Sequence, residues 1–409
     1  MSDHFDELEV RSSDAREASI FGGMAAFLTN ATQAPGWAKH LQGVDLGSIR
    51  DRAAFAQLPV FRKSDLLTLQ QEQPPFGGLT TRPAGNLRRV FMSPGPIFDP
   101  EGYGDDWWGC GRSIYAAGLR SGDIVHNTFS YHLTPAGLMF ETGASAVGCA
   151  IIPAGTGNTE MQFDVIEHFK PVGYAGTPDY LKILLDKAEE AGRDLSSFRY
   201  GVVGGAALPE SLRAELAGRG VQVLQTYGTA DLGIVAYESA AKEGMIVNEN
   251  LILEIVRPGS GEPVADGEVG EVVVTRLNAD YPLIRFGTGD LSAVLPGTSP
   301  CGRTNVRIKG WMGRADQRTK VKGMFVDPVQ INELLKRHGE IDKARLVVTR
   351  QNEQDHMVLR FESASAAADS ASIEASLRDI TKLRGAVEQV DTDSLPNDGK
   401  VISDERTYG

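Results

Sequence analysis

The sequence is poor in the features that mark secreted, membrane-spanning and nucleic-acid-binding proteins. Its three cysteines, Cys110, Cys149 and Cys301, lie far apart and form no C-x-x-C pair, which excludes a disulfide framework and favours a reducing compartment. The first ten residues, MSDHFDELEV, are acidic and lack the apolar core of a signal peptide. The longest apolar stretch, residues 143–152, is too short to span a bilayer. These absences predict a cytoplasmic protein that is not membrane-bound.

Positive charge is also scarce. Lys and Arg number 41 against 54 Asp and Glu, a net charge of −13, which disfavours binding to nucleic acid or to an anionic membrane. A small anion held by a local basic patch is still allowed. Hydrophobic residues make up 41% and charged residues 23%. These are globular values, and the length predicts two or three domains.

Alternating apolar and helical segments predict an α/β fold. Helices and turns are expected over residues 1–70 and a loop over residues 71–105. Strands separated by helices of this length imply βαβ units and a mainly parallel sheet. Short apolar runs predict strands at residues 124–125, 150–152, 172–175, 200–203 and 222–225, and helical spacing predicts helices at residues 178–191 and 209–217.

The pattern changes twice towards the C-terminus. Residues 245–310 contain short strands with Gly/Pro turns, which predict an antiparallel or barrel-like β portion. Beyond Gly313, the expected β-α-β-β-α-β order is typical of a small ferredoxin-like α+β domain. We therefore expect a large N-terminal domain at residues 1–313 and a small, mobile C-terminal domain at residues 314–409.

Two turns after predicted strands have the composition of ligand sites, because doubly wound sheets bind ligands at the carboxyl ends of their strands. The segment VVGGAA (202–207) includes Gly204, Gly205 and Ala206, whose small side chains allow a flat ligand close to the backbone. A plain strand-to-helix turn explains it equally well. The segment QTYGTAD (225–231) offers a ring, a hydroxyl, free amides and a carboxylate suited to Mg²⁺.

Two later segments suit a nucleotide. In LIRFGTGD (283–290), Asp290 follows a Gly-Thr-Gly turn and can accept both hydroxyls of a ribose. Taken alone, this motif is better explained by an ordinary turn Asp. Residues 303–322 contain seven Lys or Arg and a single acidic residue, Asp316. In a chain this acidic, such a basic segment is either a solvated face or a site for phosphates.

Five ordered motifs together resemble the phenylacetate–CoA ligase family of adenylate-forming enzymes, over nearly the whole chain. They are PVFRKSDL (59–66), YGTAD (227–231), RFGTGD (285–290), the segment from Gly313 to Gly323, and LPNDGK (395–400). The resemblance implies that ATP and a carboxylic acid form an acyl-adenylate, and that a thiol, usually that of CoA, then attacks it. An apolar-to-aromatic acyl pocket, and so an aryl or arylacetic acid, is expected.

The resemblance also implies a role for each matching residue. Lys400 would neutralise the anions that meet at the α-phosphate, and Asp231 would hold Mg²⁺. Asp316 would be the hinge. His132 falls beside the acyl carboxylate in the family, although a buried, hydrogen-bonded histidine fits equally. The remaining expected positions are Gly204, Gly205, Ala206, Tyr227, Gly228 and Thr229 at the adenine side, Asp290 and Arg314 at the ribose, and Lys320 and Lys322 at CoA or phosphate.

The sequence departs from the family where phosphate is bound. The family loop SSGTTGKP corresponds here to FMSPGPIFDPEG (91–102), which has one hydroxyl, three prolines and two carboxylates and is a poor polyphosphate cradle. Ala230 and Gly287 replace a hydroxyl residue and an arginine. Some relatives carry a Cys/His metal cluster. Cys301 remains, but Ser239, Ile246 and Ser299 stand at the partner positions, so no zinc is expected.

Two interpretations of the function remain open. One is a divergent ligase that uses ATP, Mg²⁺ and CoA. The other is a noncatalytic member that binds AMP, an acyl-adenylate or CoA after losing ATP phosphate binding. A nicotinamide-dependent dehydrogenase is disfavoured, because no G-x-G-x-x-G segment follows any predicted strand. The sequence does not fix the oligomeric state and allows a homodimer.

Overall fold

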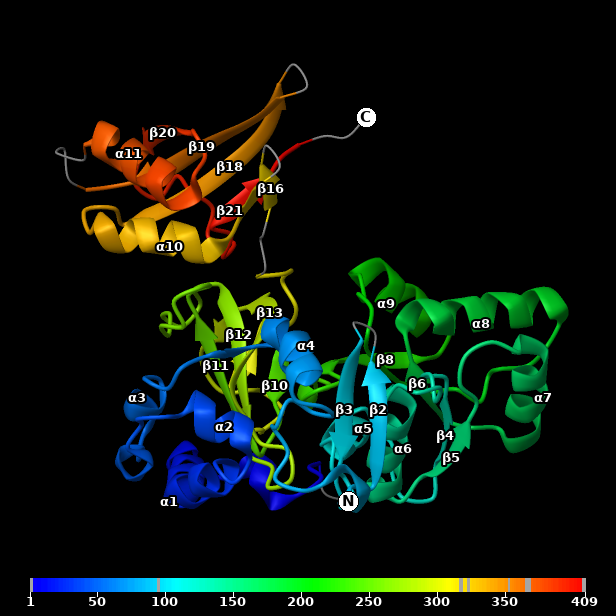
Figure 1. The fold of residues 1–409 in the computed structure, drawn as a ribbon. Coiled ribbons are helices and arrows are strands. Elements are labelled where there is room, and N and C mark those ends of the chain that lie inside the picture. Colours follow the sequence, from blue (N-terminus) through cyan, green and yellow to red (C-terminus); the bar gives the residue numbers. More distant parts are fainter. Residues whose placement is uncertain are drawn as a thin grey trace. The chain divides into compact units, whose positions relative to one another are not determined.

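A computed structural model describes residues 3–93, 96–315, 319–321, 324–351, 354–364 and 369–406 (Figure 1). The chain divides into two compact units. The first unit comprises Met1–Leu253, Val274–Phe286 and Leu295–Gly310, and the second comprises Glu254–Val273, Gly287–Val294 and Trp311–Gly409. Within the described residues, none of the helices has the length and apolar character needed to cross a membrane. The expected domain limits at residues 313 and 314 remain a prediction.

Short helices dominate the N-terminal part of the first unit, as expected. The N-cap Ser12 accepts a hydrogen bond from the backbone N–H of Ala15 and so starts the longest of them. Lys63 begins another, after the short strand β1 (Phe61–Arg62). The helical elements are η1 (Glu7–Val10), α1 (Ser13–Ala31), α2 (Pro35–His40), η2 (Leu46–Ser48), α3 (Arg52–Phe55), α4 (Lys63–Glu72) and η3 (Ala84–Asn86).

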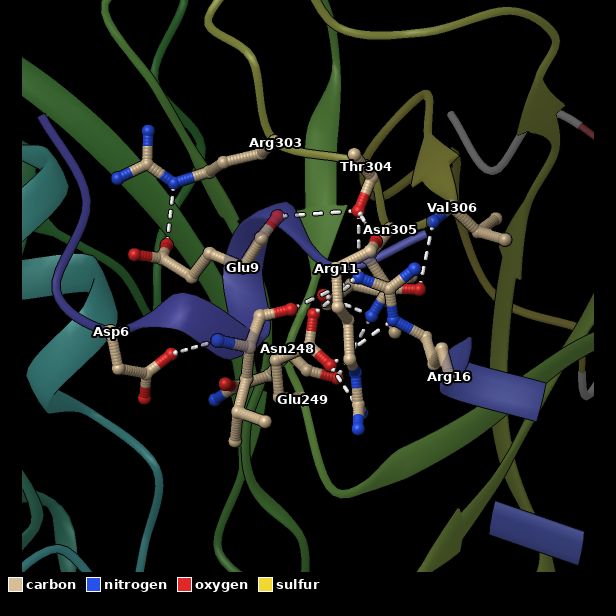
Figure 2. A network of polar contacts seen from close by, with 12 residues as sticks. Asp6, Glu9, Arg11, Arg16, Asn248, Glu249, Arg303, Thr304, Asn305 and Val306 are labelled. Atoms are coloured by element: carbon tan, nitrogen blue, oxygen red, sulfur yellow. Dashed lines mark hydrogen bonds and ion pairs between the residues drawn. The ribbon is translucent and has the colours of Figure 1, made fainter. Parts of the chain in front are cut away.

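Buried ion pairs fix the N-terminal segment to the rest of the first unit (Figure 2). The carboxylate of Glu249 accepts from Arg11 at 2.8 Å and from Arg16 at 2.9 Å. The carboxylate of Glu9 accepts from Arg303 at 2.5 Å and from the Tyr237 hydroxyl at 2.6 Å. Because each buried charge has a partner of opposite sign, this network is stable away from water.

A nine-stranded sheet forms the centre of the first unit, with strand order β14-β15-β10-β9-β8-β7-β6-β4-β5. Strands β5, β4, β6, β7 and β8 pair in parallel, and β8, β9, β10 and β15 pair antiparallel. The strands are β4 (Ile124–Asn127), β5 (Ala150–Pro153), β6 (Gly173–Gly176), β7 (Tyr200–Val203), β8 (Gln222–Thr229), β9 (Gly233–Glu238), β10 (Met245–Val247), β14 (Val294–Leu295) and β15 (Arg307–Ile308). The parallel sheet and its five strands confirm the sequence prediction.

Helices cover this parallel sheet and bury its apolar side chains. Leu181, Leu184 and Ala188 recur on one face of the same helix and pack in one cluster with Val203 and Val223 of the sheet. Figure 1 shows α7 and α8 beside β4 and β6. The helices are α5 (Gly111–Ala116), α6 (Ala136–Val147), α7 (Thr159–Phe169), α8 (Pro178–Ala191) and α9 (Glu210–Gly218).

The segment expected to be a loop, residues 71–105, contains an antiparallel hairpin. Strands β2 (Arg89–Ser93) and β3 (Ile97–Glu101) pair in register from Arg89 with Glu101 to Ser93 with Ile97. The side chains of β2 alternate between buried and exposed positions, a strand pattern that the surrounding prolines and glycines obscure in the sequence.

The expected barrel-like portion is a four-stranded sheet in which β1 and β11 are the end strands. Its order is β1-β13-β12-β11, with β11 (Leu251–Val256), β12 (Gly270–Arg276) and β13 (Leu283–Ser292). The strands expected at residues 251–256 and 271–275 correspond to β11 and β12, whereas β13 begins seven residues before the strand expected at residues 290–295. Because this strand order has two end strands, the portion is an open sheet and not a closed barrel.

The C-terminal part of the second unit has helices and a four-stranded sheet of order β20-β19-β18-β21. Its core joins Leu334 and Leu377 of the helices to Leu346, Leu359 and Phe361 of the sheet. The elements are β16 (Thr319–Val321), β17 (Met324–Val326), α10 (Pro328–Arg337), β18 (Lys343–Gln351), β19 (Gln354–Glu362), α11 (Ser370–Thr381), β20 (Ala386–Val390) and β21 (Ile402–Asp404).

This order corrects the ferredoxin-like expectation at one point. The first predicted strand, residues 320–326, forms the separate hairpin β16–β17 instead of entering the sheet. The edge position beside β18 belongs to β21, where Leu346 pairs with Ile402. The two hairpin strands satisfy their backbone hydrogen bonds by pairing with each other, from Thr319 with Val326 to Val321 with Met324, and so form a separate sheet.

Candidate active site

A cavity of about 580 Å³ opens at the carboxyl ends of β4, β6, β7 and β8 in the first unit. This is the edge at which parallel α/β sheets bind ligands. Its walls are formed by Ser93, Thr128, Phe129, Ser130, Thr134, Pro135, Ala136, Met139, Phe140, Thr156, Thr177, Asp179, Tyr180, Gly204, Gly205, Thr226, Gly228, Thr229, Ala230 and Ile234. Four of the expected nucleotide-binding residues, Gly204, Gly205, Gly228 and Thr229, therefore lie together.

Glycine is required at two of these positions. A Cβ atom on Gly204 would lie 2.6 Å from Oγ1 of Thr226, so any side chain would separate the ends of β7 and β8. Gly205 has a φ of +72°, a left-handed conformation that other residues rarely adopt. Nearby, the carbonyl of Ala206 accepts a hydrogen bond from Gln225 at 3.4 Å, and the ring of Tyr227 is buried. The turn thus places backbone at the cavity, and the nucleotide-binding role of these residues remains a prediction.

One wall of the cavity is aromatic and adjoins the glycine turn, because a Cβ atom on Gly205 would lie 3.8 Å from the Phe129 ring. The rings of Phe129 and Phe140 stack with centroids 4.3 Å apart and an interplanar angle of 20°, beside Met139 and Tyr180. The Tyr180 hydroxyl accepts a hydrogen bond from Gln162 at 3.1 Å, which orients its ring. This wall offers apolar surface to a flat hydrophobic group. Met139, Phe140 and Tyr180 carry no signal in the sequence, because their segments converge with that of Phe129 only in the fold.

His132 lies on the loop between β4 and α6 and is exposed. Its backbone N–H donates to the Ser130 hydroxyl at 3.2 Å, and Ser130 and Thr134 on either side line the cavity. The alternative expectation of a buried, hydrogen-bonded histidine is therefore wrong. A role at the acyl carboxylate remains a prediction.

Asp231, the expected Mg²⁺ ligand, forms an ion pair with Lys63. Its Oδ2 atom lies 2.5 Å from Nζ of Lys63, and its side chain is 0% exposed. The backbone carbonyl of Asp231 accepts a hydrogen bond from Arg276 at 3.3 Å. Arg276 also lies 3.6 Å from the centre of the Trp107 ring, and burial lowers its pKa to about 9. This arrangement does not fit a divalent cation, because the Asp231 carboxylate is enclosed and the ammonium group of Lys63 already contacts it.

The hairpin that replaces the family's phosphate loop has few groups free to bind phosphate. The hydroxyl of Ser93 donates to the carbonyl of Ile97 at 3.2 Å, and the Glu101 carboxylate accepts from Arg89 at 2.9 Å. Asp99 is fully buried. Pro94 and Gly95 lie outside the described residues. That this segment is a poor polyphosphate cradle remains a prediction.

In the second unit, the two residues expected at the ribose are in contact. Oδ1 of Asp290 accepts hydrogen bonds from Arg314 at 3.0 Å and from the Trp311 indole at 3.1 Å. Asp290 and Arg314 also form a β-bridge, which fixes their backbones side by side. Arg314 is half-exposed, whereas the Asp290 side chain is only 11% exposed, so the guanidinium faces solvent and the carboxylate does not.

Lys400 is exposed and follows Gly399, which has a φ of +69°. Its backbone carbonyl accepts from Arg345 at 3.1 Å, and its N–H donates to Asp398 at 3.0 Å. The backbone is therefore held without help from the ammonium group. Of the remaining predicted residues, Asp316 and Lys322 lie outside the described residues, and for Lys320 only its backbone position in β16 is described.

The structure describes the surroundings of Cys301, where zinc was not expected. Its thiol lies 3.1 Å from the Ser299 hydroxyl and 3.6 Å from the Arg303 guanidinium. Hydrogen bonds from Ser239 and Ser299 outweigh partial burial and lower the pKa of this thiol. In the described part of the chain, His, Cys, Asp and Glu side chains nowhere form a cluster of three or more suited to a metal.

Comparison with known proteins adds family evidence to this geometry. A family model described as AMP-binding enzyme matches residues 108–278. Phenylacetate-coenzyme A ligase of Aromatoleum evansii is 31% identical over 337 residues, covering 78% of this chain and 75% of that protein. The enzyme of the same name from Escherichia coli (strain K12) is 30% identical over 337 residues, with 78% and 75% covered.

Solved structures agree in fold. The open conformation of 2-hydroxyisobutyryl-CoA ligase, in complex with 2-HIB-AMP and CoA, is 23% identical and gives a TM-score of 0.73, covering 97% of this chain and 92% of that one. The same ligase in its thioesterification state gives a TM-score of 0.70, with 99% and 93% covered. At this identity, the similarity shows the shared α/β fold, with a large N-terminal domain containing a mixed sheet and a small C-terminal domain.

Proposed function

Because this chain belongs to the phenylacetate–CoA ligase-like AMP-binding enzymes, a class of AMP-forming acid–CoA ligases, we propose that it activates a carboxylic acid with ATP. The acid forms an acyl-adenylate and releases pyrophosphate. The thiol of CoA then attacks the acyl carbon, and AMP leaves. Aryl and arylacetic acids are the proposed substrates.

One observation supports the proposal most directly, namely the single cavity that joins a glycine turn to an aromatic wall. Gly204 and Gly205 leave backbone accessible for a planar adenine, and the stacked pair Phe129 and Phe140 suits an aromatic ring. A volume of about 580 Å³ suits a small organic ligand. An aryl acyl-adenylate carries two flat groups, the adenine and the aromatic ring, and this cavity has a surface suited to each of them.

The remaining roles follow from charge and position in the motifs. Lys400 would neutralise the charge that develops when the acid attacks the α-phosphate. Asp290 would accept the ribose hydroxyls, with Arg314 holding its carboxylate in place. Tyr227 and Ala206 would complete the adenine side, and His132 would approach the acyl carboxylate. Lys320 and Lys322 would contact phosphates of CoA, and Asp316 would be the hinge.

ATP is proposed to enter as its magnesium complex, and no step is assigned to a metal bound by Asp231. The other candidate function is noncatalytic binding of AMP, an acyl-adenylate or CoA. The polar side chains Ser93, Asp99 and Glu101 of the β2–β3 hairpin are buried, which favours this alternative, because ATP needs donors for two further phosphates. A cytoplasmic location and a homodimer remain predictions from the sequence.

The test measures pyrophosphate release from Mg-ATP in the presence of hydroxylamine, which traps an acyl-adenylate without CoA. A panel of aryl, arylacetic and aliphatic acids identifies the substrate class. If the protein is a ligase, we expect pyrophosphate release with one aromatic class of acid. Absence of release with every acid, together with a thermal shift caused by AMP or CoA, would support the noncatalytic alternative.

A further inference from the structure

The ion pair between Lys63 and Asp231 is built from two segments far apart in sequence. Lys63 is the first residue of α4, directly after β1. Asp231 follows β8, at the turn into β9. The side chain of Lys63 is 29% exposed and that of Asp231 is 0% exposed, with 2.5 Å between Nζ and Oδ2. An enclosed carboxylate strengthens such a contact, because little water competes for it.

The other groups near Asp231 are the acidic Asp99, the neutral Tyr281 and the cationic Arg276. Asp99, carried by β3, lies against it and is fully buried. Both carboxyl oxygens of Asp99, Oδ1 of Asp231 and the hydroxyl of Tyr281 have no hydrogen-bond partner among the described residues. A proton shared between two neighbouring carboxyl groups satisfies such oxygens without a metal. Arg276 donates hydrogen bonds to the backbone carbonyls of Asp231 and Trp107.

Magnesium is poorly matched to this site. Mg²⁺ requires near-octahedral oxygen ligands, keeps several of its waters and is usually held by one or two carboxylates together with phosphate. Asp231 has no exposed oxygen to offer to a hydrated ion, and one of its oxygens already contacts an ammonium group. A divalent ion at this carboxylate would also be repelled by the nearby positive charge of Lys63.

We propose that Lys63 occupies the place of a divalent cation at Asp231, so that the chain itself supplies the positive charge of this site. Lys63 is a positioning residue, since it acts by neutralising and orienting Asp231. The free protein then has no site for Mg²⁺ at Asp231. This inference concerns the protein without nucleotide and does not depend on which acid, if any, is activated.

The test is a titration of the full-length protein with Mn²⁺, which prefers the same oxygen ligands as Mg²⁺ and whose free form is counted by electron paramagnetic resonance. The wild type and Asp231→Asn should bind the same number of Mn²⁺ ions. Lys63→Met should bind one more Mn²⁺ ion, with an affinity at least about tenfold higher than the wild type shows at Asp231. The double variant Lys63→Met/Asp231→Asn should lose that site. Lys39→Met, which removes an exposed lysine, should behave as the wild type.

Two results would overturn the proposal. In the first, the wild type binds one more Mn²⁺ than Asp231→Asn, which would make Asp231 a metal ligand despite Lys63. In the second, Lys63→Met and the double variant bind Mn²⁺ equally, which would mean that Lys63 does not occupy a cation site. The comparison of wild type with Asp231→Asn uses an isosteric change, so the proposal stays testable if Lys63→Met does not fold.

Discussion

The carboxyl group of Asp99 lies against that of Asp231 in the interior of the first unit, and the pKa of Asp99 is raised from 3.8 to about 8. Burial is the larger cause and the neighbouring Asp231 the second. Asp99 is therefore protonated in the folded protein at a pH where the unfolded chain has already ionised it.

This shift predicts how stability depends on pH. Between about pH 4 and pH 8 the folded state retains a proton that the unfolded state releases, so the free energy of unfolding falls as the pH rises through this range. Asp99→Asn cannot ionise and should weaken this fall. Urea unfolding at pH 6 and pH 9 measures this change in the free energy of unfolding for both proteins. The exposed neighbour variant Asp105→Asn should keep the wild-type pH dependence, and an unchanged dependence in Asp99→Asn would contradict the prediction.

The N-terminal network predicts a large loss of stability when one partner is removed. Glu249→Ala leaves the buried guanidinium of Arg16 without its carboxylate (Figure 2). Breaking a buried pair in this way costs about 3–5 kcal/mol. The control is Glu17→Ala, which breaks the pair with Arg52, whose side chains are 43% and 33% exposed for Arg52 and Glu17. It should cost less than about 1 kcal/mol. Equal losses in the free energy of unfolding for Glu249→Ala and Glu17→Ala, measured by chemical denaturation, would contradict this prediction.

The sequence analysis predicted the fold where local periodicity was strong. The strand at residues 200–203 and the helix at residues 178–191 occur within the predicted limits, because each carries one uninterrupted apolar pattern. The β2–β3 hairpin was missed because Pro94, Pro96 and Pro100 hide its alternation. Strand order in the C-terminal sheet was also missed, since β21 joins β18 by pairing between distant segments.

The candidate site was predicted in part for the same reason. Glycine turns such as Gly204 and Gly205 are local signals and were identified. Phe140 carries no signal of its own, and its stacking on Phe129 depends on how α6 packs beside β4. Lys63 stands within a recognised motif, but its contact with Asp231, 168 residues away in the chain, cannot be inferred from spacing.

The aromatic wall predicts a change in acid preference. Phe140→Leu removes the ring that stacks on Phe129, a contact of about 0.5–1.5 kcal/mol. If the wall binds the acyl group, KM should rise by about threefold to tenfold for aromatic acids and less for aliphatic ones, as measured by hydroxamate formation. Phe169→Leu removes a ring that is 53% exposed and should leave both classes of acid unchanged. Equal changes in KM for aromatic and aliphatic acids would show that the aromatic wall does not bind the acyl group.

Lys400 provides the sharpest test of the proposed reaction, because its two half-reactions can be measured separately. Its backbone hydrogen bonds to Arg345 and Asp398 do not involve the ammonium group, so Lys400→Ala should fold normally. Loss of positive charge at the α-phosphate should lower adenylation by at least about a hundredfold and spare thioester formation from preformed acyl-adenylate. Pyrophosphate release and thioester absorbance measure the two steps. Lys336→Ala, at an exposed position of α10, should leave both rates unchanged. Equal loss in the two steps would remove Lys400 from the adenylation role and assign it to nucleotide binding in general.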